Sequence, residues 1–392
     1  MRYADRMNTL GTETAFEVLA KARALEAKGR SMVHLEIGEP DFDTPAPIRA
    51  AAIHAIEEGF THYGPSPGLP EIREVIAQYM ARDRGIPVAA DQVVVTPGGK
   101  PVLTFGVLAT VNPGDEVIVP NPGFPIYESA VRFAGGTPVS LLLDEKRGFR
   151  FGAADIERLL TPRTKMVILN SPHNPTGSVL PARDMDEIAT ILRDRDIWVL
   201  ADEIYSKIIY GVKHESIATR PGMQEKTIIL DGFSKTYAMT GWRLGYGVMN
   251  PTVAKHVARL ATNVYSCATT FVQRAATTAL NGPQDEAQAM AKEFSRRKDV
   301  ILECLARIPG ITCAKPQGAF YVFPNIRALN MKSAEVEQAL LEEAGVAALS
   351  GTAFGSNGEG FVRFSYANSV EQIREGMKRF ETLVQSHAKA AR

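Results

Sequence analysis

Short runs of apolar, β-branched residues alternate with amphipathic stretches through the middle of the chain. Such runs, bounded by Gly, Pro or Asn, are typical of buried strands. They lie at 92–96, 116–119, 165–170, 197–202, 226–230 and 244–249. Helical patterns separate several of them, at 71–84, 101–110 and 182–195. Because strands that alternate with helices form parallel sheets covered on both faces, this region predicts a mostly parallel α/β sheet.

The two ends of the chain carry a different pattern. A helix at 19–29 and a short alternating strand at 33–37 precede the sheet region. After Pro251 the pattern is mainly helical, and the last part mixes short strands with helices, at 284–307, 319–323, 333–343, 346–349, 361–365 and 370–385. At 392 residues the chain exceeds the size of one growing core. We therefore expect a larger domain at 46–282 and a smaller α+β domain at 283–392, with 1–45 forming an N-terminal arm and part of the smaller domain.

Composition and charge exclude several classes of function. Lys plus Arg and Asp plus Glu both number 44, so no basic excess indicates a nucleic-acid partner or an anionic membrane surface. The N-terminus has no apolar core of signal-peptide length, and no run in the chain reaches the length of a membrane span. Three cysteines and seven scattered histidines argue against a disulfide framework and a metal site. We expect a cytoplasmic protein without metal, membrane or nucleic-acid partners.

Candidate chemistry begins with a lysine that follows one of the predicted strands. The stretch 231–245, DGFSKTYAMTGWRLG, places Lys235 in a loop, with Arg243 eight residues further on. A single lysine after a strand is most often a solvated surface residue. The stretch, however, resembles the lysine signature of class I/II aminotransferases, which are pyridoxal-phosphate enzymes of fold type I. Residues 232–235 and 243–245 occupy the positions of that signature.

The resemblance has direct implications for cofactor and fold. It implies that pyridoxal 5′-phosphate is the cofactor, that Lys235 holds it as a Schiff base, and that Arg243 binds its phosphate, with a hydroxyl contact from Ser234. It also implies a larger domain with a mixed, mostly parallel seven-stranded sheet beside the smaller α+β domain. Matching motifs run in order from a Gly-Glu-Pro loop at 38–40 to Arg363 and so cover nearly the whole chain.

A glycine pair follows the first predicted strand of the sheet. Gly98 and Gly99, before Lys100, leave backbone N–H groups exposed at the start of a helix, where an anion is stabilised. The spacing is not that of a P-loop, because Pro101 follows the lysine. A plain strand-to-helix turn is the alternative. In the family this place contacts the cofactor phosphate, which implies that role for residues 98–100.

Further candidates lie at the ends of predicted strands, where open α/β sheets bind ligands. Asp202 ends a buried strand, and a buried carboxylate is costly unless it is paired. The resemblance pairs it with the protonated pyridine nitrogen of the cofactor. It also implies that Tyr205 and Asn174 contact the 3′-oxygen of the cofactor, that Asn174 contacts substrate, and that Phe124 stacks on the ring beside the substrate. Because aspartate-specific relatives often carry Trp at the place of Phe124, strict aspartate specificity is not expected.

Two residues are assigned to the substrate carboxylate and one to a partner subunit. The resemblance implies that Arg363 grips the α-carboxylate in a two-pronged salt bridge, for which lysine is a poor substitute. It gives Gly38 a contact to the same group. It also implies that Tyr63 crosses a dimer interface to the cofactor phosphate of the partner, so that the active unit is a homodimer. The alternatives are a structural ion pair for Arg363, a domain connector for the loop of Gly38 and a packing role for Tyr63.

These assignments predict a transaminase with Lys235, Asp202 and Tyr205 as catalytic residues. It would move an amino group from an L-amino acid to a 2-oxo acid, with 2-oxoglutarate as the expected acceptor, in two half-reactions. Another reaction on the same cofactor, such as β-elimination, cyclisation or decarboxylation, is the alternative. A ligand-sensing regulator is disfavoured, because only about thirty residues precede the first predicted strand and a DNA-binding module would need more. The residue that reads the substrate side chain stays open: Lys100, a neighbouring Arg or none.

Overall fold

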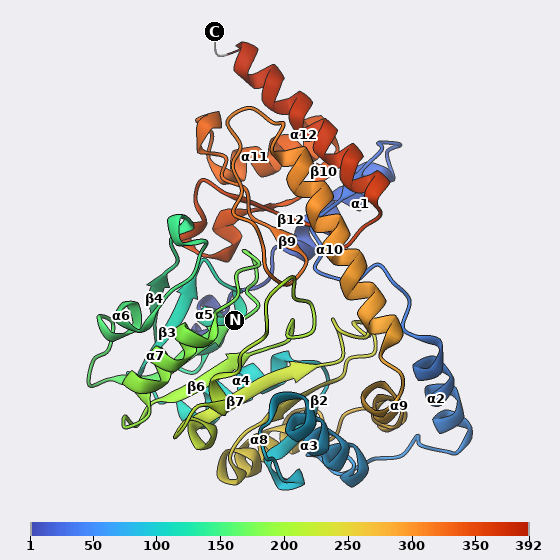
Figure 1. Ribbon diagram of the computed structural model, residues 1–392, viewed down its shortest axis with the longest axis vertical. Helices are drawn as coiled ribbons and strands as arrows, with labels where there is room; N and C mark the ends of the chain where they lie inside the picture. Colours follow the sequence, from blue (N-terminus) through green and yellow to red (C-terminus); the bar gives the residue numbers. More distant parts are fainter. Residues whose placement is uncertain (1, 391–392) are drawn as a thin grey trace.

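A seven-stranded sheet forms the centre of the larger part of the molecule (Figure 1). The computed structural model describes residues 2–390. The strand order is β2-β8-β7-β6-β5-β3-β4, and only β8 runs antiparallel to its two neighbours. The strands are β2 (Val93–Thr96), β3 (Glu116–Asn121), β4 (Thr137–Leu142), β5 (Thr164–Asn170), β6 (Trp198–Asp202), β7 (Thr227–Gly232) and β8 (Gly245–Val248). The mixed, mostly parallel seven-stranded sheet expected from the sequence is confirmed.

Both faces of this sheet are buried, which is why its strands read as continuous apolar runs. In β5, Met166 and Ile168 pack on one face, whereas Val167 and Leu169 pack on the other. One face is covered by α4 (Lys100–Thr110), α5 (Ile126–Phe133) and α8 (Pro251–Val264). The other is covered by α2 (Ala46–Glu57), α3 (Pro70–Arg84), α6 (Ala153–Glu157), α7 (Ala182–Leu192) and α9 (Thr270–Asn281).

A smaller part, drawn at the top of Figure 1, is built from a three-stranded antiparallel sheet and long helices. Its sheet order is β11-β12-β9, and β1 pairs with β10 in a separate parallel ladder. Its elements are α1 (Ala15–Glu26), β1 (Val33–His34), α10 (Asp285–Leu305), β9 (Tyr321–Val322), α11 (Ser333–Ala339), β10 (Val346–Ala347), β11 (Leu349–Ser350), β12 (Val362–Ser365) and α12 (Val370–Ala390). The first strand of the chain therefore lies beside its C-terminal region. The domain boundaries at 45 and 282 stay a prediction.

The carboxyl ends of the parallel strands meet at one edge of the larger sheet. Asn170 at the end of β5 lies opposite Asp202 at the end of β6, and Asp202 lies opposite Leu230 in β7. The loops that follow these strands must therefore lie close together. The topology alone gathers the loop residues of distant segments into one place.

A buried charge cluster fixes the ends of β6 and β7 from behind. Arg84, the last residue of α3, donates to Asp231 Oδ2 at 2.6 Å and to Ser206 Oγ at 2.7 Å. It also pairs with Glu203, whose carboxylate lies 3.1 Å from His214 Nε2. Buried charges are tolerated when they are paired and hydrogen-bonded in this way. The cluster holds the two strands that carry Asp202 and precede Lys235.

Candidate active site

A cavity of about 520 Å³ opens at the carboxyl edge of the larger sheet. Its lining combines loops of the larger part with Gly38 and Arg363 from the smaller part. The predicted site residues that line it are Gly38, Gly99, Lys100, Phe124, Asn174, Asp202, Tyr205, Ser234, Lys235, Arg243 and Arg363. Gly98 adjoins this lining, and Tyr63 lies outside it. The cavity therefore brings together residues that are more than 300 positions apart in the sequence.

Lys235 lies in the loop that joins β7 to β8. Turn hydrogen bonds from Tyr237 N to Phe233 O and from Met239 N to Ser234 O shape this loop, each 3.1 Å long. The Lys235 Nζ atom donates to Gly38 O across the cavity. Burial lowers the pKa of its ammonium group from 10.5 to about 8. At pH 7 about a tenth of this amine is therefore unprotonated, far more than for an ordinary lysine, and the unprotonated form is the nucleophile and proton acceptor.

Arg243 and the glycine pair form a seat for an anion. Gly98 has a φ of 84°, and a Cβ atom there would lie 2.3 Å from Arg243 Nη2, so the guanidinium needs a glycine beside it. Gly99 is the N-cap of α4, and the first N–H groups of this helix form its positive end. Arg243 itself adopts a φ of 55°, a conformation that non-glycine residues rarely hold outside functional sites. The arrangement fits the phosphate of the cofactor.

Asp202 is a buried carboxylate that lacks a basic partner among residues 2–390. It accepts a hydrogen bond of 2.7 Å from Tyr127 Oη and one of 3.2 Å from Ile204 N. Burial raises the pKa of this carboxyl group from 3.8 to about 6. A protonated ring nitrogen would supply the missing positive charge through a charge-assisted hydrogen bond. Asp202 therefore fits the pyridine end of pyridoxal phosphate.

Arg363 enters the cavity from β12 as a fully buried guanidinium. Its Nη1 donates to Asn174 Oδ1 at 3.1 Å and its Nη2 to Glu36 O, whereas its Nε has no hydrogen-bond partner within the described chain. The guanidinium lies over the rings of Tyr321 and Phe354, 4.4 Å and 4.9 Å from their centroids. A buried cation held by neutral groups fits an incoming carboxylate.

Position 38 must be a glycine because the side chain of Tyr321 packs directly against its backbone. A Cβ atom at this position would lie 2.1 Å from Tyr321 Oη, which also shares a hydrogen bond of 2.7 Å with Tyr205 Oη. A larger residue would displace this tyrosine pair. The loop therefore approaches the site closely through its backbone.

Several residues at the cavity received no role from the sequence, and Tyr127, Tyr321 and Glu13 are three of them. Tyr127 holds Asp202, Tyr321 holds Tyr205, and Glu13 lines the cavity from the segment before α1. Tyr127 lies in the first turn of α5, three residues after Phe124, and its ring packs edge-on to that ring at 5.6 Å, so the stretch around Phe124 offered a signal. Tyr321 and Glu13 have no local motif, because only the tertiary fold brings them to the site.

Tyr63 does not reach the cavity of its own chain. Its side chain is 89% exposed, which is unusual for a large aromatic residue. The resemblance places the corresponding tyrosine across a subunit interface, and an exposed tyrosine is consistent with that role. The contact to a partner stays a prediction.

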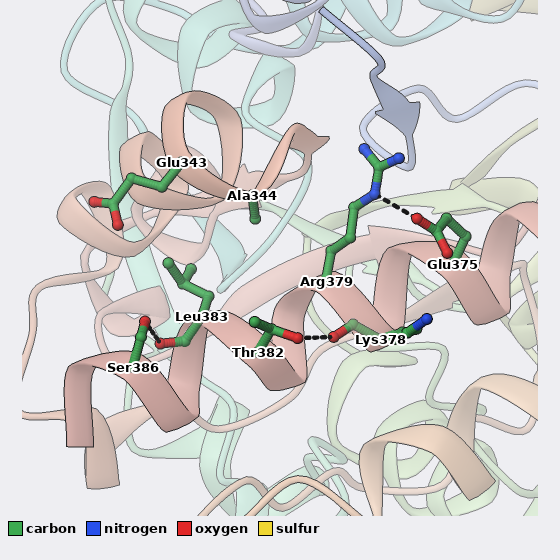
Figure 2. A pocket seen from close by; sticks show the side chains of 8 residues that line it. All are labelled: Glu343, Ala344, Glu375, Lys378, Arg379, Thr382, Leu383 and Ser386. Carbon is green, nitrogen blue, oxygen red and sulfur yellow. Dashed lines mark hydrogen bonds and ion pairs between the residues drawn. The ribbon is translucent and has the colours of Figure 1, made fainter. Parts of the chain in front are cut away.

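A second, shallower depression lies on the outer side of the smaller part, along α12 (Figure 2). Arg379 lines this depression and donates to Glu375 Oε1 at 2.7 Å and to Ser31 O at 2.9 Å. The guanidinium of Arg379 thus already binds a carboxylate and the backbone. Within residues 2–390 no cluster of His, Cys, Asp or Glu could hold a metal ion, and no helix is long and apolar enough to cross a membrane. The cavity at the sheet edge is the candidate active site.

The fold and the cavity together define a pyridoxal-phosphate-dependent α/β enzyme. An amine of lowered pKa, an anion seat, a buried carboxylate for the ring nitrogen and a buried guanidinium stand in one cavity. Comparison with known proteins gives the family. Residues 30–380 match the model of aminotransferase class I and II.

Relatives with established names support this assignment over the whole chain. An aspartate aminotransferase of Pyrococcus abyssi is 39% identical over 98% of both chains. An aromatic-amino-acid aminotransferase of Thermococcus litoralis is 37% identical, again over 98% of both. The solved aspartate aminotransferase from Thermus thermophilus with maleate superposes with a TM-score of 0.93 at 36% identity, covering 98% of this chain and 100% of that one. The chain belongs to the class I and II aminotransferases and is a pyridoxal-phosphate-dependent transaminase.

Proposed function

We propose that the protein moves the amino group of an L-amino acid to a 2-oxo acid, with 2-oxoglutarate as acceptor, in a ping-pong cycle. The observation that carries the proposal is the position of Arg363 in the same cavity as Lys235 and Asp202. A guanidinium there can hold the α-carboxylate that amino acids and 2-oxo acids share. One binding mode therefore serves the donor in the first half-reaction and the acceptor in the second.

Lys235 and Arg363 perform the steps closest to the substrate. When bound, pyridoxal phosphate supplies an electron sink that stabilises negative charge at the substrate Cα. In this proposal Arg363 and Asn174 orient the substrate by its carboxylate, while Lys235 holds the cofactor between turnovers. Once released, the Lys235 amine accepts the proton from Cα and returns a proton to the cofactor side. Its pKa of about 8 suits both directions of transfer near neutral pH.

The remaining residues of the site hold and tune the cofactor. Asp202 stabilises a proton on the ring nitrogen, and Tyr127 keeps that carboxylate in place. Tyr205 and Asn174 would donate to the 3′-oxygen, and Phe124 would cover the ring. Arg243, the backbone of residues 98–100 and Ser234 bind the phosphate.

An absorbance titration tests the proposal and separates it from the other reactions of this cofactor. We expect purified holoenzyme to lose its absorbance band above 400 nm when L-amino acids are added, and to recover it when 2-oxoglutarate is added. Recovery requires an amino group stored on the enzyme, which β-elimination, cyclisation or decarboxylation do not leave. Release of pyruvate, ammonia or carbon dioxide without oxo-acid-dependent recovery would overturn transamination.

Assembly and location complete the proposal. We propose a cytoplasmic homodimer in which Tyr63 of each subunit contacts the cofactor phosphate of its partner. The exposed ring of Tyr63 supports the subunit contact, and the three free cysteines support the location. The larger and smaller domains would meet near residues 45 and 282.

Replacing the carboxylate-binding arginine tests the substrate assignment. Arg363→Lys is expected to lower kcat/KM for amino acids and oxo acids alike by about 10- to 100-fold, because lysine cannot make the two-pronged contact and one charge-assisted hydrogen bond contributes about 1.5–3 kcal/mol. Steady-state kinetics with both substrates measure the change. Arg307→Lys, at an exposed position in the turn that follows α10, is the matched control and should retain wild-type kinetics. Equal values for the two variants would contradict the assignment.

A further inference from the structure

Glu13 and Lys100 form an ion pair inside the active-site cavity. Glu13 belongs to the segment that precedes α1, whereas Lys100 begins α4, and both line the cavity. The Glu13 side chain is only 20% exposed and that of Lys100 is 48% exposed. The pair thus stands at the side of the cavity that opens toward solvent, with the carboxylate as its more enclosed member.

Every other basic group of the cavity already has an assignment. Arg243 serves the phosphate, Lys235 holds the cofactor and Arg363 serves the α-carboxylate. Lys100 is then the one cation in this lining left to meet a substrate side chain, and Glu13 is bound to it. Glu39, the remaining carboxylate besides Asp202, accepts from Thr240 Oγ1.

We propose that Glu13 is a specificity-determining residue, which cancels the charge of Lys100 so that the enzyme prefers donors with uncharged side chains. The inference rests on the proposed transamination and names its donor class. Ala15 and Phe16 follow Glu13 closely in the chain, Leu103 lies one turn of α4 after Lys100, and all three apolar residues line the same cavity. An uncharged side chain can contact these residues without disturbing the ion pair.

Either kind of charged side chain must break the pair to be recognised. A second carboxylate, as in a dicarboxylic amino acid, would need Lys100 and would face the charge of Glu13. A cationic side chain would need Glu13 and would face the charge of Lys100. Repulsion and lost pairing of this kind discriminate between ligands because they weaken the complex with the unwanted one. The pair therefore disfavours both charged classes.

The experiment compares donor preference in charge variants of the holoenzyme. The quantity is kcat/KM for three donor classes, represented by glutamate, phenylalanine and arginine, with one fixed oxo acid. Glu13→Gln frees Lys100, so the glutamate-to-phenylalanine ratio is expected to rise by about tenfold. Lys100→Gln frees Glu13, so the arginine-to-phenylalanine ratio is expected to rise by a similar factor. The double variant should restore a preference for phenylalanine.

The controls separate this inference from the proposed function. Glu17→Gln removes an exposed carboxylate one helical turn further on and should leave all ratios unchanged. Ratios that do not move in Glu13→Gln, in an enzyme that transaminates normally, overturn the specificity role of Glu13. Wild-type preference for glutamate over phenylalanine also overturns it. Absence of oxo-acid-dependent turnover with any donor would instead overturn transamination itself.

Discussion

Lys235→Ala is expected to lower kcat by at least about 10⁴-fold. Proton transfer by a positioned side chain contributes about 10²- to 10⁴-fold in rate, and here the same amine also holds the cofactor. No other lysine of the cavity lies on the β7–β8 loop to take over the task. Single-turnover measurements with the cofactor-loaded variant follow the loss of donor amino groups directly.

A matched variant shows whether the loss belongs to this amine. Lys255→Ala removes an exposed lysine from α8 and should leave kcat unchanged. The absorbance band above 400 nm should also shift in the Lys235 variant, because the cofactor is then bound without its covalent link. A Lys235→Ala enzyme with kcat within tenfold of wild type would remove the lysine from the mechanism.

Asp202→Asn is expected to reduce kcat by about 10²- to 10³-fold, the usual effect of removing one preorganised electrostatic contact. The amide cannot stabilise a positive ring nitrogen, so less of the negative charge at Cα is drawn into the ring. The amide has nearly the shape of the carboxylate, so KM should change much less than kcat. Steady-state kinetics separate the two parameters. A variant with wild-type kcat would show that ring protonation does not depend on Asp202.

The same substitution should lower kcat but raise the stability of the cofactor-free protein at neutral pH. Burial raises the pKa of Asp202 from 3.8 to about 6, so the folded chain holds this proton more tightly than the unfolded chain. The free energy of unfolding therefore falls as pH rises from about 4 to about 6, by about 3 kcal/mol in total. Asp202→Asn lacks this dependence. Above pH 6 the cofactor-free variant should be more stable than the cofactor-free wild type.

Urea unfolding at pH 4.5 and pH 7.5 measures this difference. The gap between variant and wild type should widen at the higher pH, and bound cofactor should reverse the order by pairing with the wild-type carboxylate. Other carboxyl groups titrate equally in both proteins and cancel in the comparison. A gap that is the same at both pH values would show that burial of this carboxylate is not costly.

The larger sheet was predictable from the sequence because both of its faces are buried. Its central strands read as continuous apolar runs between loop residues, and their boundaries agree with the structure within a few residues. β4 was not predicted, because it lies at the sheet edge and most of its residues are partly exposed. The predicted helix at 182–195 ends earlier, at Leu192. A helical pattern does not show where the last turns of a helix fray.

The smaller part was predicted less accurately. The run at 346–349 was expected to be one strand, but Val346–Ala347 pairs with β1 and Leu349–Ser350 pairs with β12. The strand expected at 33–37 is reduced to Val33–His34. Periodicity indicates that such residues are buried, but it does not identify their partners. Short strands depend on those partners for their length.

The candidate site was recognisable where a motif lies within one loop, as around Lys235 and the glycine pair at 98–99. Contacts between distant segments were not recognisable from the sequence. Tyr321 meets Tyr205, and Glu13 meets Lys100, only because two parts of the molecule face each other across the cavity. The roles of the predicted residues stay predictions, but the fold brings all of them except Tyr63 to or beside one cavity.

The antiparallel pairing of β7 and β8 bears on how the enzyme can release a product and still keep its cofactor for the next turnover. Lys235 and Arg243 stand on the connection between these two strands, so one hairpin would carry both the covalent link to the cofactor and the arginine proposed for its phosphate. Gly38 and Arg363, which we propose to contact the substrate carboxylate, belong to the other part of the molecule. A small separation of the two parts would thus release a product while the cofactor keeps its anchors. Product exchange and cofactor retention are assigned to different structural units.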